Sequence, residues 1–432
     1  MERQYLCIDF KSFYASVECV ERGLDPMTAS LVVADPERCD TTICLAVSPA
    51  LKKLGVKNRC RIFEIPKHLE YIKAPPRMRL YIEYSAEIYG VYLKYLSKDD
   101  IYIYSIDEAF LDVTDYLSMY RLTARELGER IRQDILKTTK IPSAFGVGTN
   151  LYLAKIALDI TAKHSSEFVG ELDEEKYRRE LWDHRPLTDF WRIGAGTAKR
   201  LEERGIYTMR DITRTSPKTL EKLLGVDYEI LLDHAYGREP VTIADIKAYK
   251  AQSHSLSSGQ VLSRDYNFSE ALTIVKEMAD NLCLELFDEG LVTRSITLSV
   301  VYSGVERRQS RGSLRLEDYT NSAQTLIFSA AKLFERVMEK NAVIRKITLV
   351  YNDVIEEGFA QYNLFSSQPT KEKERRQMQA VSSIKKRFGK NAILRGLDLK
   401  KEATARERNR QIGGHKSGGD SFEKKGDSDE NK

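Results

Sequence analysis

The sequence lacks any long hydrophobic segment. No run of about 18 apolar residues occurs in its 432 residues, so nothing in it predicts a membrane-spanning helix. The N-terminus also lacks the basic region, the apolar stretch and the small-residue cleavage site of a secretory signal. We therefore expect a cytoplasmic protein that does not associate with a membrane.

Cysteine is scarce and is not arranged for metal or disulfide chemistry. The six cysteines contain no Cys-x-x-Cys pair, which argues against a zinc site and against a disulfide framework. Cys7 falls inside an apolar strand pattern, where we interpret it as a small core residue.

The overall composition is that of an ordinary soluble protein, with 42% hydrophobic and 31% charged residues. A chain of this length is too long for one core, so we expect about three or four domains.

Positive charge is concentrated near the C-terminus. Residues 366–416 contain fifteen Lys or Arg against five Asp or Glu, whereas residues 1–365 contain fifty basic and fifty-four acidic side chains. This excess would attract a polyanion through counterion release, or it forms the solvated surface of a tail that binds nothing. The polar residues 418–430 have the composition of a disordered end.

Hydrophobic periodicity predicts an α+β layout in the first part of the chain. Tyr5–Phe10 predicts a strand, and a helix is expected from Ser12. Short apolar runs, a helical piece ending at Gly55 and a strand at Cys60–Ile65 predict a small inserted subdomain. The elements expected next are a helix, a hairpin and a second helix, at Tyr71–Tyr95, Ile101–Val113 and Leu122–Thr138.

The pattern changes in the second part of the chain. A short strand near Ser143 and a helix over Asn150–Lys163 are followed by helical residues 170–238. Residues 252–356 then predict a β-α-β-β-α-β domain. Its expected strands are Ser253–Leu262, Thr293–Tyr302, Arg308–Leu316 and Ile344–Val354, and its expected helices are Ser269–Glu289 and Ser322–Met338.

Two acidic strings about a hundred residues apart carry the clearest chemical signal. Asp9 ends the first predicted strand, and Asp107 and Glu108 lie within the predicted hairpin. Their hard oxygen ligands suit Mg²⁺ held jointly with substrate phosphates. Adjacent residues on a regular strand point to opposite faces, so Asp107 and Glu108 can converge only at a hairpin tip or a bulge. The strings predict a metal-dependent phosphoryl-transfer site.

Two further motifs indicate contacts with a nucleic-acid backbone. The run Arg192–Ile206 has the pattern of a helix-hairpin-helix, in which Gly194 and Gly196 let the backbone approach a phosphate, with Lys199 on the following helix. A plain helical turn is the alternative. Four arginines on the middle strands of the last domain could grip a phosphate backbone or form a solvated face: Arg307, Arg308, Arg311 and Arg315.

The two acidic strings, Ile8–Glu18 and Tyr104–Asp112, resemble the catalytic motifs of the Y-family translesion DNA polymerases, the DinB/UmuC group. The similarity is closest to UmuC-like repair polymerases of Gram-positive bacteria and runs from residue 1 to about 410. It implies an α+β multidomain right-hand fold. The implied parts are a palm at 1–25 and 72–165, fingers at 26–71, a thumb at 166–240, a little finger at 245–357, and a clamp-binding peptide with a basic, partly disordered tail at 358–432.

The resemblance implies that Asp9, Asp107 and Glu108 are catalytic and hold two Mg²⁺ ions, with the main-chain carbonyl of Phe10. Tyr14 matches the steric gate, whose ring would clash with a ribose 2′-hydroxyl. A packed helix aromatic is the alternative for Tyr14.

The implied nucleotide-binding residues are Phe13, Tyr14, Lys52, Lys155 and Lys163, although Phe13 could instead pack into the palm. Lys163 is displaced by one residue from the family pattern, which on a helix is a rotation of about 100°. Lys11, where the family usually has Asp or Asn, and Pro49 are further departures.

A short peptide after the last domain, Gln361-Tyr362-Asn363-Leu364-Phe365, resembles the Q-x-x-L-F peptide with which bacterial polymerases bind the sliding clamp. Its clamp-binding residues would be Gln361, Leu364 and Phe365. An exposed Leu-Phe pair in a polar linker has no core to join, which favours a docking role.

The function implied is DNA-directed DNA polymerisation by two-metal transfer from dNTP to a primer 3′-hydroxyl, with low-fidelity translesion synthesis in an SOS-type damage response. The expected partners are primer-template DNA, dNTP and the bacterial sliding clamp, and we expect a monomer. Two alternatives are a palm-type nucleotidyl cyclase and a catalytically silent DNA- and clamp-binding scaffold. The helix-hairpin-helix and the basic tail argue against the cyclase, and the three acidic residues argue against the scaffold.

Overall fold

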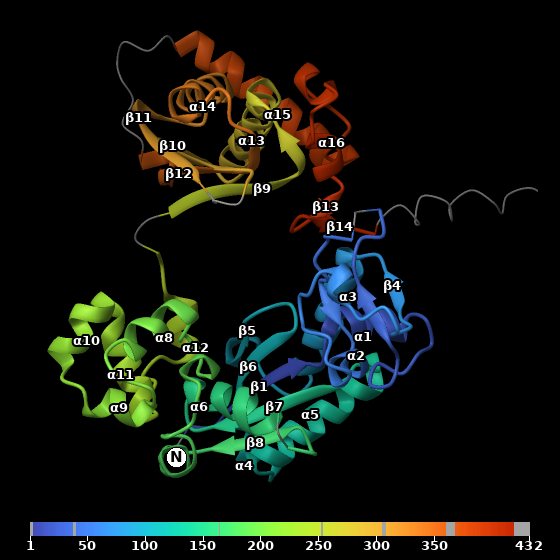
Figure 1. Cartoon of the computed structure of the whole chain (residues 1–432), viewed down its shortest axis with the longest axis vertical. Helices are drawn as coiled ribbons and strands as arrows, with labels where there is room; N and C mark the ends of the chain where they lie inside the picture. Colours follow the sequence, from blue (N-terminus) through green and yellow to red (C-terminus); the bar gives the residue numbers. More distant parts are fainter. Residues whose placement is uncertain are drawn as a thin grey trace, which may run out of the picture. The chain divides into compact units, whose positions relative to one another are not determined.

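The computed structural model describes residues 3–37, 40–163, 165–251, 254–304, 308–359 and 368–418 (Figure 1). The chain divides into two compact units, Met1–Tyr249 with Lys416–Lys432, and Lys250–His415. Across these described ranges, no helix combines the length and the apolar character needed to cross a bilayer.

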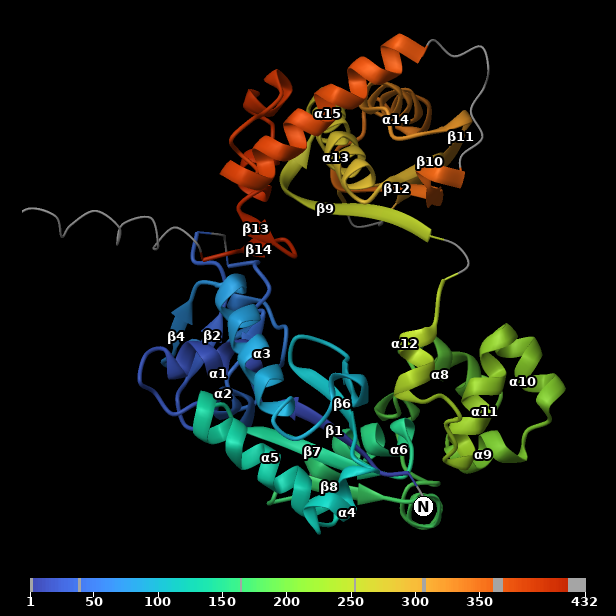
Figure 2. The same ribbon diagram turned by 180° about the vertical axis from the view of Figure 1, so that it is seen from behind.

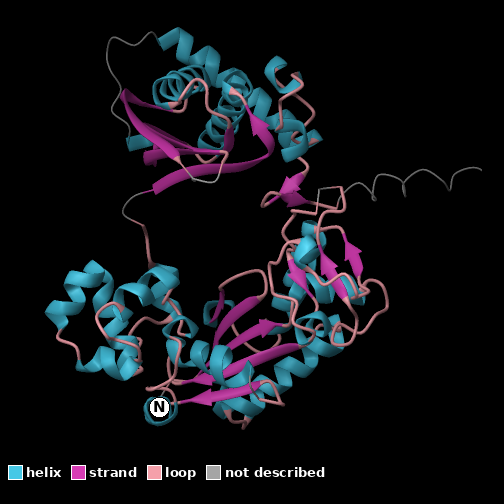
Figure 3. Ribbon diagram, in the orientation of Figure 1, coloured by secondary structure: helices cyan, strands magenta, loops and turns pink. Residues whose placement is uncertain are grey.

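A five-stranded sheet forms the centre of the first unit, in the order β5-β6-β1-β7-β8 (Figure 3). The strands are β1 Tyr5–Phe10, β5 Ile101–Ile103, β6 Glu108–Asp112, β7 Ser143–Gly148 and β8 Val169–Leu172. β1 is central and pairs antiparallel with both β6 and β7, while β7 and β8 are parallel. The predicted strand and hairpin are confirmed, but β8 replaces the start of the region predicted to be helical.

Helices cover this sheet, and α5 runs alongside it in Figure 2. They are α3 Met78–Tyr92, α4 Tyr116–Tyr120, α5 Ala124–Thr139 and α6 Leu151–Ile156, which continues as a π-helical turn, Ala157–Ala162. Two glycines allow α6 to lie directly on β7. A Cβ on Gly146 would lie 2.2 Å from the Ala154 carbonyl oxygen, and one on Gly148 would lie 2.1 Å from the Ala154 nitrogen. Only glycine fits at this approach.

The inserted subdomain contains a three-stranded sheet in the order β3-β2-β4. Its elements are β2 Leu31–Val33, β3 Ala46–Val47, β4 Ile72–Ala74 and α2 Pro49–Lys53, and α1 Phe13–Val20 precedes it. The strand predicted at Cys60–Ile65 is wrong, because Ile62–Glu64 forms a 3₁₀ turn. The helix predicted from Tyr71 begins only at Met78, since β4 and the pair Pro75-Pro76 precede it and proline disfavours helix before it.

Short helices fill the rest of the first unit, as the pattern predicted. They are α7 Glu174–Glu180, α8 Ala195–Glu202, α9 Met209–Arg214, α10 Pro217–Leu224, α11 Tyr228–Tyr236 and α12 Ile243–Ala248. The apolar faces of α7 to α11 form one core around Phe190, Leu201, Met209 and Leu220, whereas Ile243 of α12 belongs to the core beneath the sheet.

The second unit contains an antiparallel sheet in the order β11-β10-β12-β9, with helices packed on one face. The elements are β9 His254–Tyr266, α13 Phe268–Asp288, β10 Leu291–Tyr302, β11 Gln309–Thr320, α14 Ala323–Val337 and β12 Ile344–Glu356. This order confirms the predicted β-α-β-β-α-β domain. Alternate residues of β10 point to the helices (Ile296, Leu298, Val300) and leave serines and threonines on the opposite face.

The basic segment that follows is helical rather than irregular. It forms α15 Gln368–Phe388, α16 Ala405–Arg408, and the short strands β13 Gln411–Ile412 and β14 His415–Lys416. Met378 of α15 joins the core of the second unit, and Ser382 donates a hydrogen bond to Asp288. The buried carboxylate of Glu277 on α13 accepts hydrogen bonds from the amides of Thr404 and Ala405. This segment is therefore part of the folded second unit.

Candidate active site

The end of β1 brings two carboxylates face to face. Asp9 lies directly opposite Glu108 on β6. The amide of Phe10 donates to the Asp107 carbonyl at 3.1 Å, so the neighbouring pair Asp9 and Glu108 is a non-hydrogen-bonded pair. Cα atoms in such pairs are about 4.5 Å apart and their side chains lie on one face. The sheet register thus places two like charges side by side.

Asp107 adds the third carboxylate from the turn that precedes β6. The Ser105 hydroxyl donates to Asp107 Oδ1 at 2.8 Å and holds the side chain in the turn. Burial raises the pKa of Asp9, and the nearby Asp107 and Glu108 raise it further, to about 7. Because the turn frees Asp107 from the strand's alternation, it can share a site with Glu108.

Lys155 holds the carboxylate of Glu108. Its Nζ lies 2.8 Å from both Glu108 oxygens and 3.0 Å from Asp159, and the Lys155 side chain is only 9% exposed. Burial alone would lower the pKa of Lys155, but the surrounding Cys7, Asp159 and Glu108 raise it, so the ammonium stays charged. The Cys7 thiol also donates to Glu108, at 3.3 Å. Lys155 therefore binds Glu108, whereas the sequence predicted that Lys155 would contact the nucleotide.

The donors fit a divalent cation, although among the described residues no three Asp, Glu, His or Cys side chains are arranged as a complete metal cluster. Glu108 is turned onto Lys155, which explains this in part. Asp9 shows most clearly that a cation would fit here. Its pKa is raised by burial and by the negative charges of Asp107 and Glu108, which a cation would neutralise. Asp9, Asp107 and the Phe10 carbonyl supply hard oxygen ligands, and Glu108 is shared with Lys155.

The two aromatic residues at the start of α1 differ in exposure. Phe13 is 2% exposed, and its ring lies 5.9 Å from the rings of both Phe10 and Tyr14. Its ring is thus a core side chain. Tyr14 is half-buried, and its pKa is raised by burial and by the nearby Asp107.

Three lysines surround Asp9. Burial lowers the pKa of Lys11, Asp9 opposes this shift, and the positive charges of Lys163 and Lys52 lower it further. Removal from water likewise lowers the pKa of Lys52, which also feels Asp9 and Lys163. Because these charges change one another's pKa values, the three ammonium groups lie within electrostatic range of one another and of Asp9. We call Lys11, Lys52 and Lys163 the lysine cluster.

The π-helical turn explains how Lys163 reaches this cluster. The predicted helix Asn150–Lys163 is present, but residues 157–162 are π-helical. A π turn contains one residue more than an α turn, so it offsets the rotation of about 100° that a one-residue displacement causes. Lys163 also pairs with Asp159 at 3.0 Å.

The residues predicted to contact DNA lie at exposed positions wherever the structure describes them. Gly194 is the N-cap of α8, a Cβ on Gly194 or Gly196 would meet nothing within 4 Å, and the Lys199 side chain is 78% exposed. Arg311 and Arg315 lie opposite Ser299 and Ser295, on the sheet face without helices.

Arg308 is exposed as well, but its guanidinium pairs with Glu339 at 3.0 Å. Arg307, Gln361, Leu364 and Phe365 lie outside the described residues.

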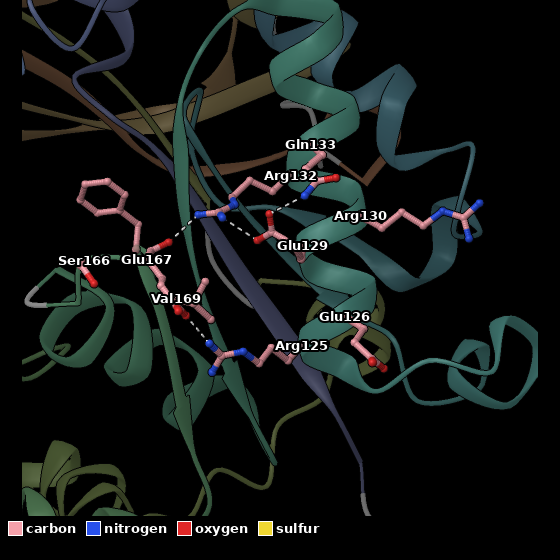
Figure 4. A pocket seen from close by; sticks show the side chains of 10 residues that line it. Arg125, Glu126, Glu129, Arg130, Arg132, Gln133, Ser166, Glu167 and Val169 are labelled. Atoms are coloured by element: carbon pink, nitrogen blue, oxygen red, sulfur yellow. Dashed lines mark hydrogen bonds and ion pairs between the residues drawn. The ribbon is translucent and has the colours of Figure 1, made fainter.

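A hollow in the first unit lies away from the site. It measures about 640 Å³ and lies between α5 and the segment before β8 (Figure 4). Its arginines are matched by acidic groups: Arg125 pairs with Glu167 at 2.5 Å and Arg132 with Glu129 at 2.6 Å. Such a hollow offers no net charge to an anion.

Sequence reasoning missed the residues that support the site. Lys155 as the partner of Glu108, and Cys7 as a donor to it, are contacts between distant segments, for which a single sequence contains no periodic signal. In the sequence, the one indication of this contact was the pair Lys155 and Asp159, which are four positions apart on a predicted apolar helix.

Comparisons with known proteins agree with this geometry. The chain matches the impB/mucB/samB family over residues 8–159 and the C-terminal domain of that family over residues 253–364. It is 29% identical to the putative UV-damage repair protein UvrX of Bacillus subtilis, covering 96% of this chain and 98% of UvrX. It is also 29% identical to DNA polymerase IV 2 of Bacillus subtilis, covering 96% and 99%.

Among solved structures, a chimeric Y-family DNA polymerase of Dbh and Dpo4 matches with a TM-score of 0.64, at 24% identity, over 82% of this chain and 99% of the chimera. Fold and site together define a DNA-directed DNA polymerase of the Y family. Within that class the chain belongs to the impB/mucB/samB family, the UmuC/DinB-like repair polymerases.

Replacing Lys155 by Met should destabilise the protein strongly, because Glu108 and Asp159 would lose the cation between them. A buried pair broken on one side costs about 3–5 kcal/mol of unfolding free energy. Urea unfolding followed by circular dichroism measures this loss. The matched control is Lys163→Met, which removes the half-exposed partner of the same Asp159 and should cost no more than about 1 kcal/mol. Equal stability of the two variants would contradict the assigned role.

Proposed function

We propose that the converging carboxylates Asp9, Asp107 and Glu108 catalyse primer extension from dNTPs, using two Mg²⁺ ions, on damaged as well as intact templates. The observation that supports this proposal is that Asp9, at the end of the central strand, lies opposite Glu108 and within electrostatic range of Asp107. Burial, together with these two carboxylates, raises the pKa of Asp9 to about 7. An SOS-type damage response, a cytoplasmic location and a monomeric state belong to the same proposal.

In this mechanism the chain's residues orient the reactants. When bound, Mg²⁺ would lower the pKa of the primer 3′-hydroxyl and stabilise charge on the leaving pyrophosphate. Asp9, Asp107 and the Phe10 carbonyl would hold the cations, and Lys155 fixes the position of the Glu108 carboxylate beside them. Tyr14 lies within electrostatic reach of Asp107, so its ring is suited to contact the sugar of the incoming nucleotide.

The lysine cluster is suited to hold the triphosphate. Burial lowers the pKa values of Lys11 and Lys52, and the neighbouring lysines lower them further. A polyanion placed between these ammonium groups would offset both effects. Lys11 would thus supply a positive charge that the usual family residue, Asp or Asn, does not.

Two surfaces are suited to primer-template DNA. The helix-free face of the second unit combines Arg311 and Arg315 with a row of hydroxyl side chains, a composition that binds a phosphate backbone without reading bases. In the first unit, the open backbone at Gly194 and Gly196 begins α8, where amides face a phosphate. We assign the palm, fingers, thumb and little finger to the residue ranges predicted from the sequence.

Primer extension tests the proposed function. Purified protein with Mg²⁺ and dNTPs should extend a primer on an undamaged template and insert opposite an abasic site. Asp107→Ala should lower the rate by about 100-fold or more, because several kcal/mol of charge stabilisation are lost and each 1.36 kcal/mol is a factor of ten. DNA binding measured by fluorescence anisotropy should be unchanged. Full activity of Asp107→Ala would refute the site, and the absence of any extension by the parent protein would refute the function.

Replacing Lys11 by Ala should raise the KM for dNTP by about tenfold with little change in kcat, the effect of losing one charged contact to a phosphate. Steady-state single-nucleotide insertion measures both constants. Lys53→Ala, one residue beyond Lys52 on α2, is the control and should leave KM unchanged. A KM for Lys11→Ala equal to that of the control would remove Lys11 from the triphosphate site.

The peptide Gln361–Phe365 is proposed to dock the sliding clamp. Replacing Leu364 and Phe365 together by Ala should abolish stimulation of primer extension by a bacterial sliding clamp, because these are its two apolar anchors. Extension without the clamp should not change. Asn363→Ala, at a variable position of the peptide, is the control, and clamp stimulation that persists in the double variant would exclude this peptide as the docking site.

A further inference from the structure

The ring of Tyr14 rests on a second tyrosine that no motif assigns. Tyr14 and Tyr81 are stacked, with ring centroids 4.6 Å apart and an interplanar angle of 22°. Tyr14 belongs to the first turn of α1 and Tyr81 to the first turn of α3, 67 residues later, and the two helices are in contact. Tyr81 is fully buried. One face of the half-exposed Tyr14 ring is therefore supported by a ring that has no space to move.

Tyr81 is itself fixed by an ion network at its hydroxyl. The hydroxyl donates to Glu18 Oε1 at 2.8 Å, and the Glu18 side chain is completely buried. Arg77 binds the same carboxylate through two hydrogen bonds of 2.9 Å, and Arg22 binds it as well. Bidentate, charge-assisted bonds of this kind have the most restricted geometry among side-chain contacts.

The protonation states favour this arrangement at neutral pH. Burial and the negative charge of Glu18 raise the pKa of Tyr81, so its hydroxyl keeps the proton that it donates. Burial would raise the pKa of Glu18, but its bonds to Arg77, Arg22 and Tyr81 lower it, so the carboxylate stays charged.

We propose that Tyr81, held by Glu18 and Arg77, is a positioning residue that fixes the ring of Tyr14 and thereby sets the discrimination between deoxyribonucleotides and ribonucleotides. The proposal rests on the proposed function, in which Tyr14 contacts the sugar. A ring that excludes a 2′-hydroxyl does so only while it cannot shift, because a displaced ring makes room for one oxygen atom. The strength of the exclusion is therefore set by what stands behind the ring.

The experiment compares kcat/KM for a dNTP and for the ribonucleotide with the same base. Tyr81→Leu keeps the site apolar and removes the stack, and it should lower the dNTP-to-rNTP ratio by about tenfold, since a misplacement of about 1 Å changes rates by up to ~100-fold. The change should come mainly from faster use of the ribonucleotide. Tyr81→Phe keeps the ring and should keep most of the discrimination, while Tyr14→Ala should abolish it.

Tyr84→Leu is the matched control. Tyr84 lies on the same helix and donates to a glutamate, Glu21, at 2.9 Å, but its ring is not among those stacked on Tyr14. Its variant should not change the ratio. A purely structural role of Tyr81 would lower thermal stability and total activity in Tyr81→Leu and leave the ratio at the parent value, and that result would overturn the inference.

The two proposals fail in different ways. If the parent protein incorporates no nucleotide, the proposed function fails. If the parent discriminates and Tyr14→Ala does not, but Tyr81→Leu and Tyr81→Phe both retain the full ratio, then only the role of Tyr81 fails. If Tyr81→Leu does not fold, Tyr81→Met, which also removes the ring and fills the space with a flexible apolar side chain, takes its place, and a parent-like ratio in that variant overturns the role.

Discussion

The convergence of negative charge at the end of β1 is the constraint on which the site depends. Antiparallel register puts Asp9 opposite Glu108, and the turn adds Asp107, so the sheet creates a repulsion that the chain must offset. It does so on one side by burying Lys155 against Glu108 and on the other by gathering the lysine cluster. The close approach of α6 to β7, which glycines permit, brings the helix that carries Lys155 and Lys163 against the sheet. In this part of the molecule, the packing of the helix on the sheet therefore also provides the positive charge that offsets the carboxylates.

Local pattern was enough for the elements and for the identity of the acidic residues, but not for their partners. The continuous apolar run Tyr5–Phe10 and the periodic apolar faces of the two long helices of the second unit are local patterns, and such patterns can be recognised without a structure. The four-residue strand β8 is too short to show a period. In the 3₁₀ turn Ile62–Glu64 only Ile62 is buried and Phe63 is exposed, and the same short apolar sequence would suit a strand. The pairing of Lys155 with Glu108 joins residues 47 positions apart, and no local sequence pattern indicates such a contact.

For Lys163, the usual rotation per residue of an α-helix does not apply, because part of its helix is π-helical. Counting about 100° per residue turns a lysine displaced by one position away from the site, and the count assumes a uniform α-helix. The chain departs from that uniformity over residues 157–162, and the additional residue of the π turn compensates for the displacement. The same lesson applies to residues 368–388, whose high charge suggested a solvated tail, while Met378 in the core and Ser382, which donates a hydrogen bond to Asp288, were enough to bind this helix to α13.

The central position of β1 has a consequence for synthesis on the ribosome. β1 is the first strand to be made, yet both its neighbours come much later, since β6 ends at Asp112 and β7 at Gly148. At about 5–20 residues per second, on the order of ten seconds pass before β1 can be paired on both sides. During that interval a nascent chain displays an unpaired apolar strand, which is a target for chaperones and for edge-to-edge association. A half-made chain therefore has no active site with which to act on nucleotides.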